Sequence, residues 1–271
     1  QIKTDFLSFV DIYWKGQILK NKNEYMNLHY GGRLFTHYYN KTYKIKDVNE
    51  QCSDPIKDKK LLKKIKVCWN MGLCDHGTYS HIKQKLFSIF RSSIFISNTN
   101  SFLYADYHKK YNLSCRIETN YGRQTVEFQR KRIKILLKKY TNTYKISRFK
   151  YLNEMKKSKC VISPFGWGEL CPRDFETFLN GGILIKPKMD FFETWPNWYV
   201  SKENTSNKKL HTYLSFKWDL SNLENIIHSV IKKYQDLKYI AKQGQEVYML
   251  YTKGENSKEI FAKRFLKLIK N

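Results

Sequence analysis

The sequence lacks any apolar run that approaches the ~18 residues needed for a membrane-spanning helix. No secretory signal is visible at its start. Its six cysteines are scattered without a Cys-x-x-Cys pair, and Cys68 and Cys160 lie in apolar runs that are expected to be buried strands. These features argue against a membrane span, a disulfide framework and a zinc site, and they indicate reduced thiols in a cytoplasmic protein.

Arginine is scarce, because only nine of the 50 basic residues are Arg and the others are Lys. The net charge of +26 favours a polyanionic partner, such as nucleic acid, an acidic glycan or an acidic membrane. Lys, Asn, Ile and Tyr are abundant together, however, as an AT-rich genome would produce. Since Arg is the usual side chain for fork-shaped recognition of phosphates and bases, specific nucleic-acid binding is not expected. A peripheral membrane contact through the basic surface is the next interpretation of the charge.

Apolar periodicity predicts an α/β protein of one large domain or two modest ones, which 271 residues and an apolar fraction of 41% allow. A strand at 65–71, a turn, a helix and a strand at 94–97 follow one another in the order of a βαβ unit. The alternation continues after residue 112 and predicts a Rossmann-like half closed by C-terminal helices. The strands of this half are expected at 113–118, 143–147, 159–164, 182–187 and 212–216.

A glycine-rich turn separates two of these strands and leads into a helix, in the stretch "SPFGWGELCPRDFE" at 163–176. Gly166 and Gly168 allow the backbone to approach a bulky ligand closely. Pro172 suits the first position of a helix, whose N-terminus is a ready anion site. Arg173 adds a fixed positive fork that suits a phosphate. The turn therefore indicates a phosphate-bearing ligand at the carboxyl end of a buried strand.

Acidic side chains flank the same turn. Glu176 lies three residues after Arg173, so both side chains can address one side of the helix. A carboxylate there can accept hydrogen bonds from the two hydroxyls of a ribose. In the simpler alternative, Glu169 and Asp174 only complement the helix dipole, while Arg173 and Glu176 pair with each other. The turn holds neither a Gly-x-Gly-x-x-Gly nor a Walker motif, so by itself it indicates nucleotide binding only weakly.

The stretch from Ser163 to Pro187 resembles the donor-binding segment of GT-B glycosyltransferases. It is most similar to the bacterial and viral "glycosyltransferase family 1" or exostosin-like proteins, with their Ser-Pro-Phe-Gly-Trp-Gly-Glu and Arg-Asp-Phe-Glu pattern. Three further stretches fit the same family: "NMGLCDHG", "MDFFETWPNWY" and "FKWDLSNLENII". The resemblance implies a GT-B-like α/β fold of two Rossmann-like halves. Residues 1–112 would form a short or incomplete acceptor-side half, and residues 113–271 would hold the nucleotide sugar.

The resemblance also implies roles for single residues. Glu176 matches the glutamate that binds the donor ribose, and Glu169 matches the earlier acidic position near the sugar or phosphates, with a catalytic role. Arg116, at the end of a strand, and Lys186, facing the cleft, would be basic ligands of the diphosphate. No cofactor or metal is expected, because no Asp-x-Asp motif follows a strand and the positive groups would neutralise the leaving diphosphate.

The acceptor side is represented by the stretch "GLCDHG", which follows a strand. Asp75 or His76 could be the general base that an inverting transfer needs. In the alternative interpretation, Asp75 caps the helix that begins near Thr78 and His76 has no catalytic part. A nucleotide sugar and a glycan or glycoconjugate acceptor are the expected partners. The competing hypotheses are a basic nucleic-acid-binding module, built on the Lys-rich helix at 123–140, and a glycosyltransferase-like domain that binds without catalysis.

Overall fold

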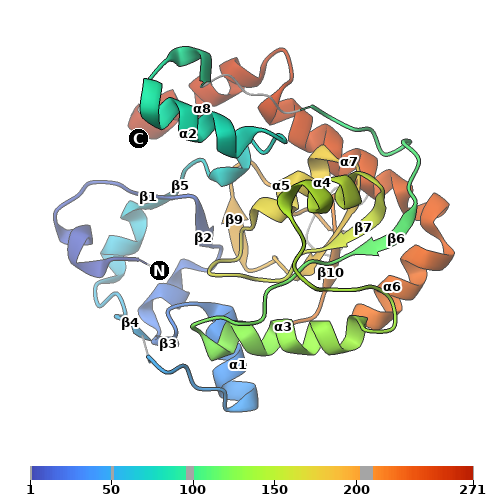
Figure 1. The fold of residues 1–271 in the computed structure, drawn as a ribbon. Helices are drawn as coiled ribbons and strands as arrows, with labels where there is room; N and C mark the ends of the chain where they lie inside the picture. Colours follow the sequence, from blue (N-terminus) through green and yellow to red (C-terminus); the bar gives the residue numbers. More distant parts are fainter. Residues whose placement is uncertain (1, 50–51, 96–100, 202–209, 271) are drawn as a thin grey trace.

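The computed structural model describes residues 2–49, 52–95, 101–201 and 210–270, and a parallel sheet lies at its centre (Figure 1). The sheet has four strands in the order β10-β8-β7-β6. They are β6 (Tyr111–Ser114), β7 (Ser158–Ile162), β8 (Ile183–Pro187) and β10 (Leu214–Phe216). Because all four strands are parallel, their carboxyl ends meet at one edge of the sheet. The protein is therefore of the α/β class, with a sheet compatible with a Rossmann-like fold.

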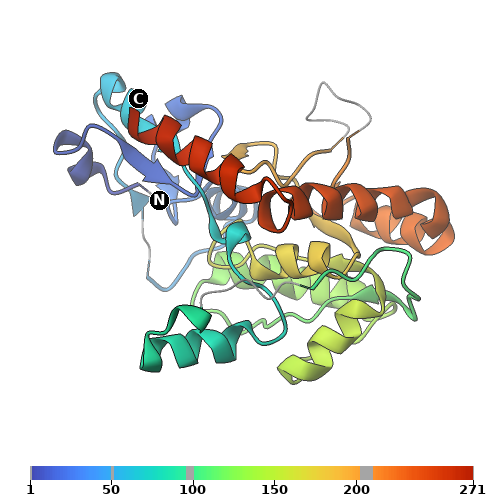
Figure 2. The ribbon, with the colours of Figure 1, turned by 90° about the horizontal axis from the view of Figure 1, so that it is seen from above.

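Helices cover both faces of this sheet. On one face, α3 (Gln124–Leu137) and α6 (Leu223–Lys232) pack against the strands. On the other face, α5 (Pro172–Leu179) lies against α7 (Tyr234–Thr252). α4 (Arg148–Lys156) precedes β7, and α8 (Ser257–Lys270) follows α7 along one side of the molecule (Figure 2).

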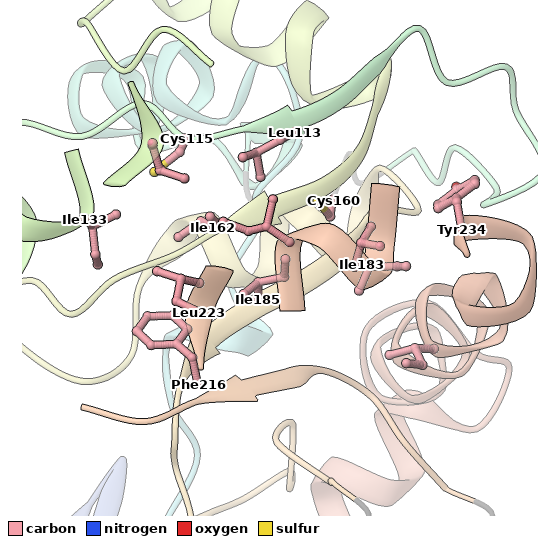
Figure 3. Packing of buried hydrophobic residues seen from close by; sticks show 14 of the residues in the cluster. Leu113, Cys115, Ile133, Cys160, Ile162, Ile183, Ile185, Phe216, Leu223 and Tyr234 are labelled. Carbon is pink, nitrogen blue, oxygen red and sulfur yellow. The ribbon is translucent and has the colours of Figure 1, made fainter. Parts of the chain in front are cut away.

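Side chains of β8 alternate between two apolar clusters. Ile183 and Ile185 point into the cluster that Figure 3 shows, together with Phe216 of β10 and residues of α3 and α6. Leu184 points the opposite way and packs with Phe175 in α5. A strand that is buried on both faces needs apolar side chains on both, which explains the apolar run Ile183–Ile185 in its sequence.

The N-terminal region consists of short elements rather than a second large sheet within the described residues. It contains three two-stranded ladders, one of which is completed by β9 (Phe192–Thr194). β1 (Tyr13–Lys15) pairs in parallel with β5 (Ile65–Val67), β2 (Gln17–Leu19) with β9, and β3 (His29–Tyr30) with β4 (Cys52–Ser53). The α-helices here are α1 (Leu34–Tyr43) and α2 (Ser80–Phe90), and the 3-10 helices are η1 (Thr4–Ser8), η2 (Lys22–Met26), η3 (Lys59–Lys64), η4 (Met71–Leu73) and η5 (Ser93–Phe95).

Residues from both ends of the chain share one aromatic core. Leu19, Phe35 and Tyr39 belong to the same buried cluster as Phe165 and Phe175. The pairing of β2 with β9 adds backbone hydrogen bonds across the same boundary. The two segments divided at residue 112 are therefore in direct contact, and the division itself stays a prediction.

Two predicted strands have no strand in their place among the described residues, and the strand predicted at 113–118 is found at 111–114 as β6. Residues 143–147 form no strand, because β6 ends at Ser114 and only one backbone hydrogen bond, from Ile117 to Thr143, joins the two segments beyond it. A strand needs a full ladder of such bonds. The strand expected at 94–97 is replaced at its start by η5, and positions 96 and 97 lie outside the described residues.

α5 is followed by Gly181-Gly182, a glycine pair that suits the end of a helix. Gly181 has a φ of +59°, and a Cβ atom there would lie 2.6 Å from the backbone of Ala105 and Leu103. Only glycine fits both the left-handed backbone and this close approach. The turn directs the chain from α5 straight into β8.

A substitution at Gly72 tests the contact between the N-terminal region and the aromatic core. A Cβ atom at this position would lie 2.6 Å from the rings of Phe175 and Trp198. We expect Gly72→Ala to lower the free energy of unfolding by about 1–3 kcal/mol, as overpacking in a core does. Gly122→Ala is the matched control, because a Cβ atom there meets nothing within 4 Å. Denaturant titration measures both, and equal stabilities would show that Gly72 does not lie beneath these rings.

Candidate functional site

A cavity of about 670 Å³ opens at the carboxyl edge of the parallel sheet. We call it the arginine cavity, because four of the nine arginines of the chain line it. Three segments of the sheet region form its walls: residues 116–121 after β6, residues 145–151 entering α4, and the first turns of α5. Residues 71–84, from η4 to α2, close it from the N-terminal side. Its charged lining residues are Asp75, Arg116, Glu118, Arg130, Lys145, Arg148, Arg173 and Glu176.

Arg116 stands two residues beyond the end of β6, as predicted, but a carboxylate already holds it. Its Nε and Nη2 atoms donate to both oxygens of Glu154 in α4, with Nη2 at 2.5 Å. Ser114 also donates to this carboxylate, at 2.6 Å. Arg116 therefore brings a partly neutralised guanidinium to the cavity, in a fixed orientation.

Arg130 and Arg173 are the more available donors. Arg130 is 4% exposed and donates to the carbonyls of Phe165 and Glu118, with its guanidinium carbon 4.5 Å from the centre of the Tyr121 ring. Arg173 donates from Nη2 to the carbonyl of Arg116 and has the Tyr151 hydroxyl as a further hydrogen-bonding neighbour, while its Nε and Nη1 atoms are buried. The five N–H donors of a guanidinium outnumber these partners, so Arg173 has capacity for a further acceptor.

The two guanidiniums also affect each other electrostatically. Burial lowers the pKa of Arg130 below its ordinary value, and the positive charge of Arg173 lowers it further. An anion placed between them would relieve both the repulsion and the unmet hydrogen bonds. The lining as a whole carries five basic side chains against three carboxylates, so an anionic ligand is favoured.

Glu176 lies in the same cavity and is held by two neighbours. Its Oε2 accepts from the Tyr151 hydroxyl at 2.8 Å, and its Oε1 lies 2.5 Å from Nη1 of Arg148. The expected pairing of Glu176 with Arg173 is absent from the described ion pairs. Burial and the nearby Glu176 charge raise the pKa of Tyr151, so its hydroxyl remains a donor. The carboxylate is thus fixed in orientation by two donors, which suits it to accept from further hydroxyls.

His76 and Asp75 enter the cavity from the loop before α2. His76 stacks on Phe175, and its Nε2 atom is 2.8 Å from the Met71 carbonyl, which can only accept. The proton therefore sits on Nε2 in the neutral ring, and Nδ1 is the basic nitrogen. Asp75 accepts from the Gly77 amide at 2.8 Å and pairs with Lys83 at 3.5 Å. Asp75 therefore does not cap α2, which begins at Ser80 with Tyr79 at its N-cap position and without a side-chain cap.

A second cavity, of about 510 Å³, lies on the other side of the glycine-rich turn. We call it the Trp14 cavity. Gly168 and Glu169 line this cavity and not the arginine cavity. Glu169 is 2% exposed and forms an ion pair with Arg33 at 2.6 Å. The two glutamates of the motif therefore face different cavities, although Met71 lines both.

Two other predicted site residues have different surroundings from those expected. Lys186 does not face a cleft, because its side chain is fully buried and lies 2.9 Å from Asp174. Gly166 donates from its amide to the Gly168 carbonyl, which closes the turn. A Cβ atom at Gly166 would lie 3.4 Å from Nη2 of Arg130, so this glycine leaves room beside that guanidinium.

The N-terminus of helix α5 offers fewer free backbone amides than a helix N-terminus usually does. The Asp174 carboxylate accepts from the Cys171 amide at 3.2 Å, and the Asp174 amide donates to the Cys171 carbonyl. Asp174 is itself wholly buried, with Ser163, Lys186 and Tyr199 as further partners. Anion binding in the arginine cavity therefore rests on the arginines more than on the helix terminus.

Three lining residues escaped the sequence interpretation: Arg130, Arg148 and Tyr151. Arg130 lies in α3, the Lys-rich helix of the nucleic-acid-binding alternative, yet its side chain is buried. The scarcity of Arg was the available signal. In a chain that uses Lys for most of its positive charge, each Arg is a candidate for bidentate recognition.

The described residues contain no group of three or more His, Cys, Asp or Glu side chains that could hold a metal ion. Among the helices of the described chain, none combines the length and apolarity needed to cross a membrane. Comparisons of the sequence with models of protein families and with curated proteins found no match. A functional assignment therefore depends on the geometry of the two cavities and on the sequence motif that they contain.

The pH dependence of stability tests the environment of His76. Burial lowers its pKa below the ordinary value of 6.5. Below about pH 6.5 the unfolded chain then binds a proton that the folded ring resists, so this residue costs stability as the pH falls. We expect the stability of wild type relative to His76→Gln to decrease when the pH is lowered from about 7.5 to about 5.5.

Thermal unfolding at a series of pH values measures this difference. His81→Gln is the control, since His81 lies five residues further on, in α2, with an exposed side chain, and it should keep the pH slope of wild type. An unchanged slope in His76→Gln would mean that His76 is not held neutral by burial.

Proposed function

We propose that the chain is a glycosyltransferase that moves a sugar from a nucleotide-sugar donor to a hydroxyl group of a glycan or glycoconjugate, without a bound metal. The donor would bind in the arginine cavity, in a GT-B-like arrangement whose N-terminal part is reduced. The observation that carries this proposal is the concentration of four of the nine arginines at the carboxyl edge of the parallel sheet. Ligands of open α/β sheets bind at this edge.

The diphosphate would lie against Arg130 and Arg173. Both guanidiniums are buried, and Arg173 has more N–H donors than the Arg116 carbonyl and the Tyr151 hydroxyl can accept. When the bond between the sugar and the diphosphate breaks, negative charge develops on the leaving phosphate oxygen. Fixed, buried cations stabilise that charge better than flexible surface groups would. This role replaces the one that Lys186 was expected to have.

The nucleoside would lie deeper along α4 and α5. Glu176 can accept from ribose hydroxyls while Arg148 and Tyr151 hold its carboxylate in place. The cavity of about 670 Å³ falls within the range of sites that enclose ligands of this size.

The acceptor would approach from the side of residues 71–84. In the transfer, the acceptor oxygen forms a bond to the anomeric carbon, and the bond from that carbon to the phosphate oxygen breaks. The acceptor hydroxyl loses its proton to a base, for which His76 is the first candidate and Asp75 the second. The neutral ring of His76, with its depressed pKa, is in the protonation state that a general base requires near neutral pH.

A thermal-shift screen against UDP, GDP, CDP and CMP, without metal, tests the donor site. We expect one of these nucleotides to raise the melting temperature, because a ligand that binds only the folded state stabilises it. Arg173→Gln should then weaken binding of the nucleoside diphosphate by about 10- to 100-fold, because it removes charge-assisted hydrogen bonds to the phosphates. Arg132→Gln is the matched control, since Arg132 lies on the same helix as Arg130 but packs against Tyr43 and Phe128.

The absence of a shift with every nucleotide, in a protein that melts cooperatively, would contradict the proposal. Salt-sensitive binding to single-stranded nucleic acid in that case would favour the nucleic-acid-binding alternative. Nucleotide binding without transfer to any acceptor would favour a binding domain.

Glu176→Gln separates recognition of the ribose from recognition of the phosphates. We expect this variant to bind the preferred nucleoside diphosphate about 10-fold more weakly, because a neutral amide accepts less strongly and has fewer acceptor sites. Affinity for inorganic pyrophosphate should stay close to that of wild type. Calorimetric titration of both ligands measures the difference. Equal losses for the two ligands would place Glu176 in phosphate binding or in the fold, and not on the ribose.

A further inference from the structure

The Trp14 cavity differs in chemistry from the arginine cavity. Aromatic side chains line it at Tyr13, Trp14 and Tyr25. Its charges are balanced, because Lys15 and Arg33 face Asp54 and Glu169, whereas the arginine cavity has an excess of cations. A balanced lining gives no electrostatic advantage to a phosphate and favours a neutral ligand.

Two buried polar atoms at this cavity have no partner within the described chain. They are Nε1 of Trp14, which can only donate, and Oε1 of Gln17, which can only accept. Leaving such an atom buried and unsatisfied costs free energy, so native proteins seldom do so without a ligand or a water in the site. The two atoms come from neighbouring strands, β1 and β2, and both residues line the cavity.

Glu169 adds a fixed acceptor beside Gln17. Nε2 of Gln17 donates to Oε2 of Glu169, and Nη1 of Arg33 donates to the same oxygen at 2.6 Å. The carboxylate is 2% exposed, and these two contacts hold it in one orientation. Gln17 is thereby also oriented, with its amide nitrogen committed to Glu169 and its carbonyl oxygen left for a ligand. The ion pair with Arg33 balances the buried charge, so the ligand need not be cationic.

We propose that the Trp14 cavity binds a neutral saccharide ring. Sugar hydroxyls both donate and accept, which matches a separate donor at Trp14 and acceptors at Gln17 and Glu169. The aromatic residues offer apolar faces for the C–H surface of a pyranose. If the proposed function holds, on which this step rests, the ring is a unit of the acceptor glycan other than the one that reacts, because the turn at Gly168 separates it from the donor cavity.

The position of the Trp14 cavity next to the arginine cavity agrees with a saccharide in one and a nucleotide in the other. Met71 lines both cavities, and the turn that carries Gly168, Glu169 and Leu170 on one side continues into Cys171 and Pro172 on the other. A saccharide in the Trp14 cavity and a nucleotide in the arginine cavity would therefore lie on the two sides of one short segment of the chain. The general base His76 lies on the arginine side of the same segment.

Saturation-transfer NMR with the full chain tests this inference. The probes are the methyl glycosides of glucose, galactose, mannose and N-acetylglucosamine, at millimolar concentrations. We expect at least one to bind wild type and to bind Trp14→Phe about fivefold more weakly, since that variant keeps an aromatic ring but loses the N–H donor. Trp167→Phe is the matched control, because Trp167 is 61% exposed and lines neither cavity. Gln17→Met provides a second variant that removes the acceptor.

The same samples are titrated with the nucleoside diphosphate that stabilises wild type, or with UDP if none does. Saccharide binding that is weakened in Trp14→Phe and Gln17→Met, with nucleotide binding unchanged, supports the site. Saccharide binding without nucleotide binding supports the site and removes the proposed function. Nucleotide binding with no glycoside bound, or glycoside binding equal in wild type and in both folded variants, overturns the inference.

Discussion

The carboxylate of Asp174 is the interaction on which the site depends. It accepts from the amide of Cys171, the hydroxyls of Ser163 and Tyr199, and the ammonium group of Lys186. These partners come from the end of β7, the start of α5, the segment after β9 and strand β8. A buried ion pair is costly unless further hydrogen bonds surround it, and here they do. Burial and the charge of Asp174 raise the pKa of Tyr199, so this hydroxyl stays protonated and donating.

This network holds the turn between β7 and α5 from within the core. Because the turn is held there, its outer side chains can face two directions. Arg173 and Glu176 follow the helix into the arginine cavity, while Glu169 precedes it and faces the Trp14 cavity. A single short segment thus takes part in two sites of different charge. The difference in charge between the two cavities arises from other segments of the chain, since Arg116, Arg130 and Arg148 line the arginine cavity and not the Trp14 cavity.

Both cavities need the N-terminal region, although it forms no large sheet within the described residues. β1 and β2 supply Trp14 and Gln17, and the loop before α2 supplies Asp75 and His76. These segments are held by the pairing of β2 with β9 and by Gly72, which lies against Phe175 and Trp198. Substitutions at these contacts should therefore change the shape of both cavities, because they move one wall of each cavity relative to the other.

The sequence by itself determined the α/β class, the unit of strand, glycine turn, helix and strand from 159 to 187, and the presence of Arg173 and Glu176 at the carboxyl edge of the sheet. Apolar periodicity and the positions of Gly and Pro are local signals, and they suffice for such features. Only the tertiary structure decided that Lys186 is a buried partner of Asp174, that 143–147 is not a strand, and that Glu169 and Glu176 face different cavities. It also decided that Arg130, Arg148 and Tyr151 join the site. These outcomes depend on which distant segments pack together, and a strand, an ion pair or a cavity wall exists only when its partner from elsewhere in the chain is in place.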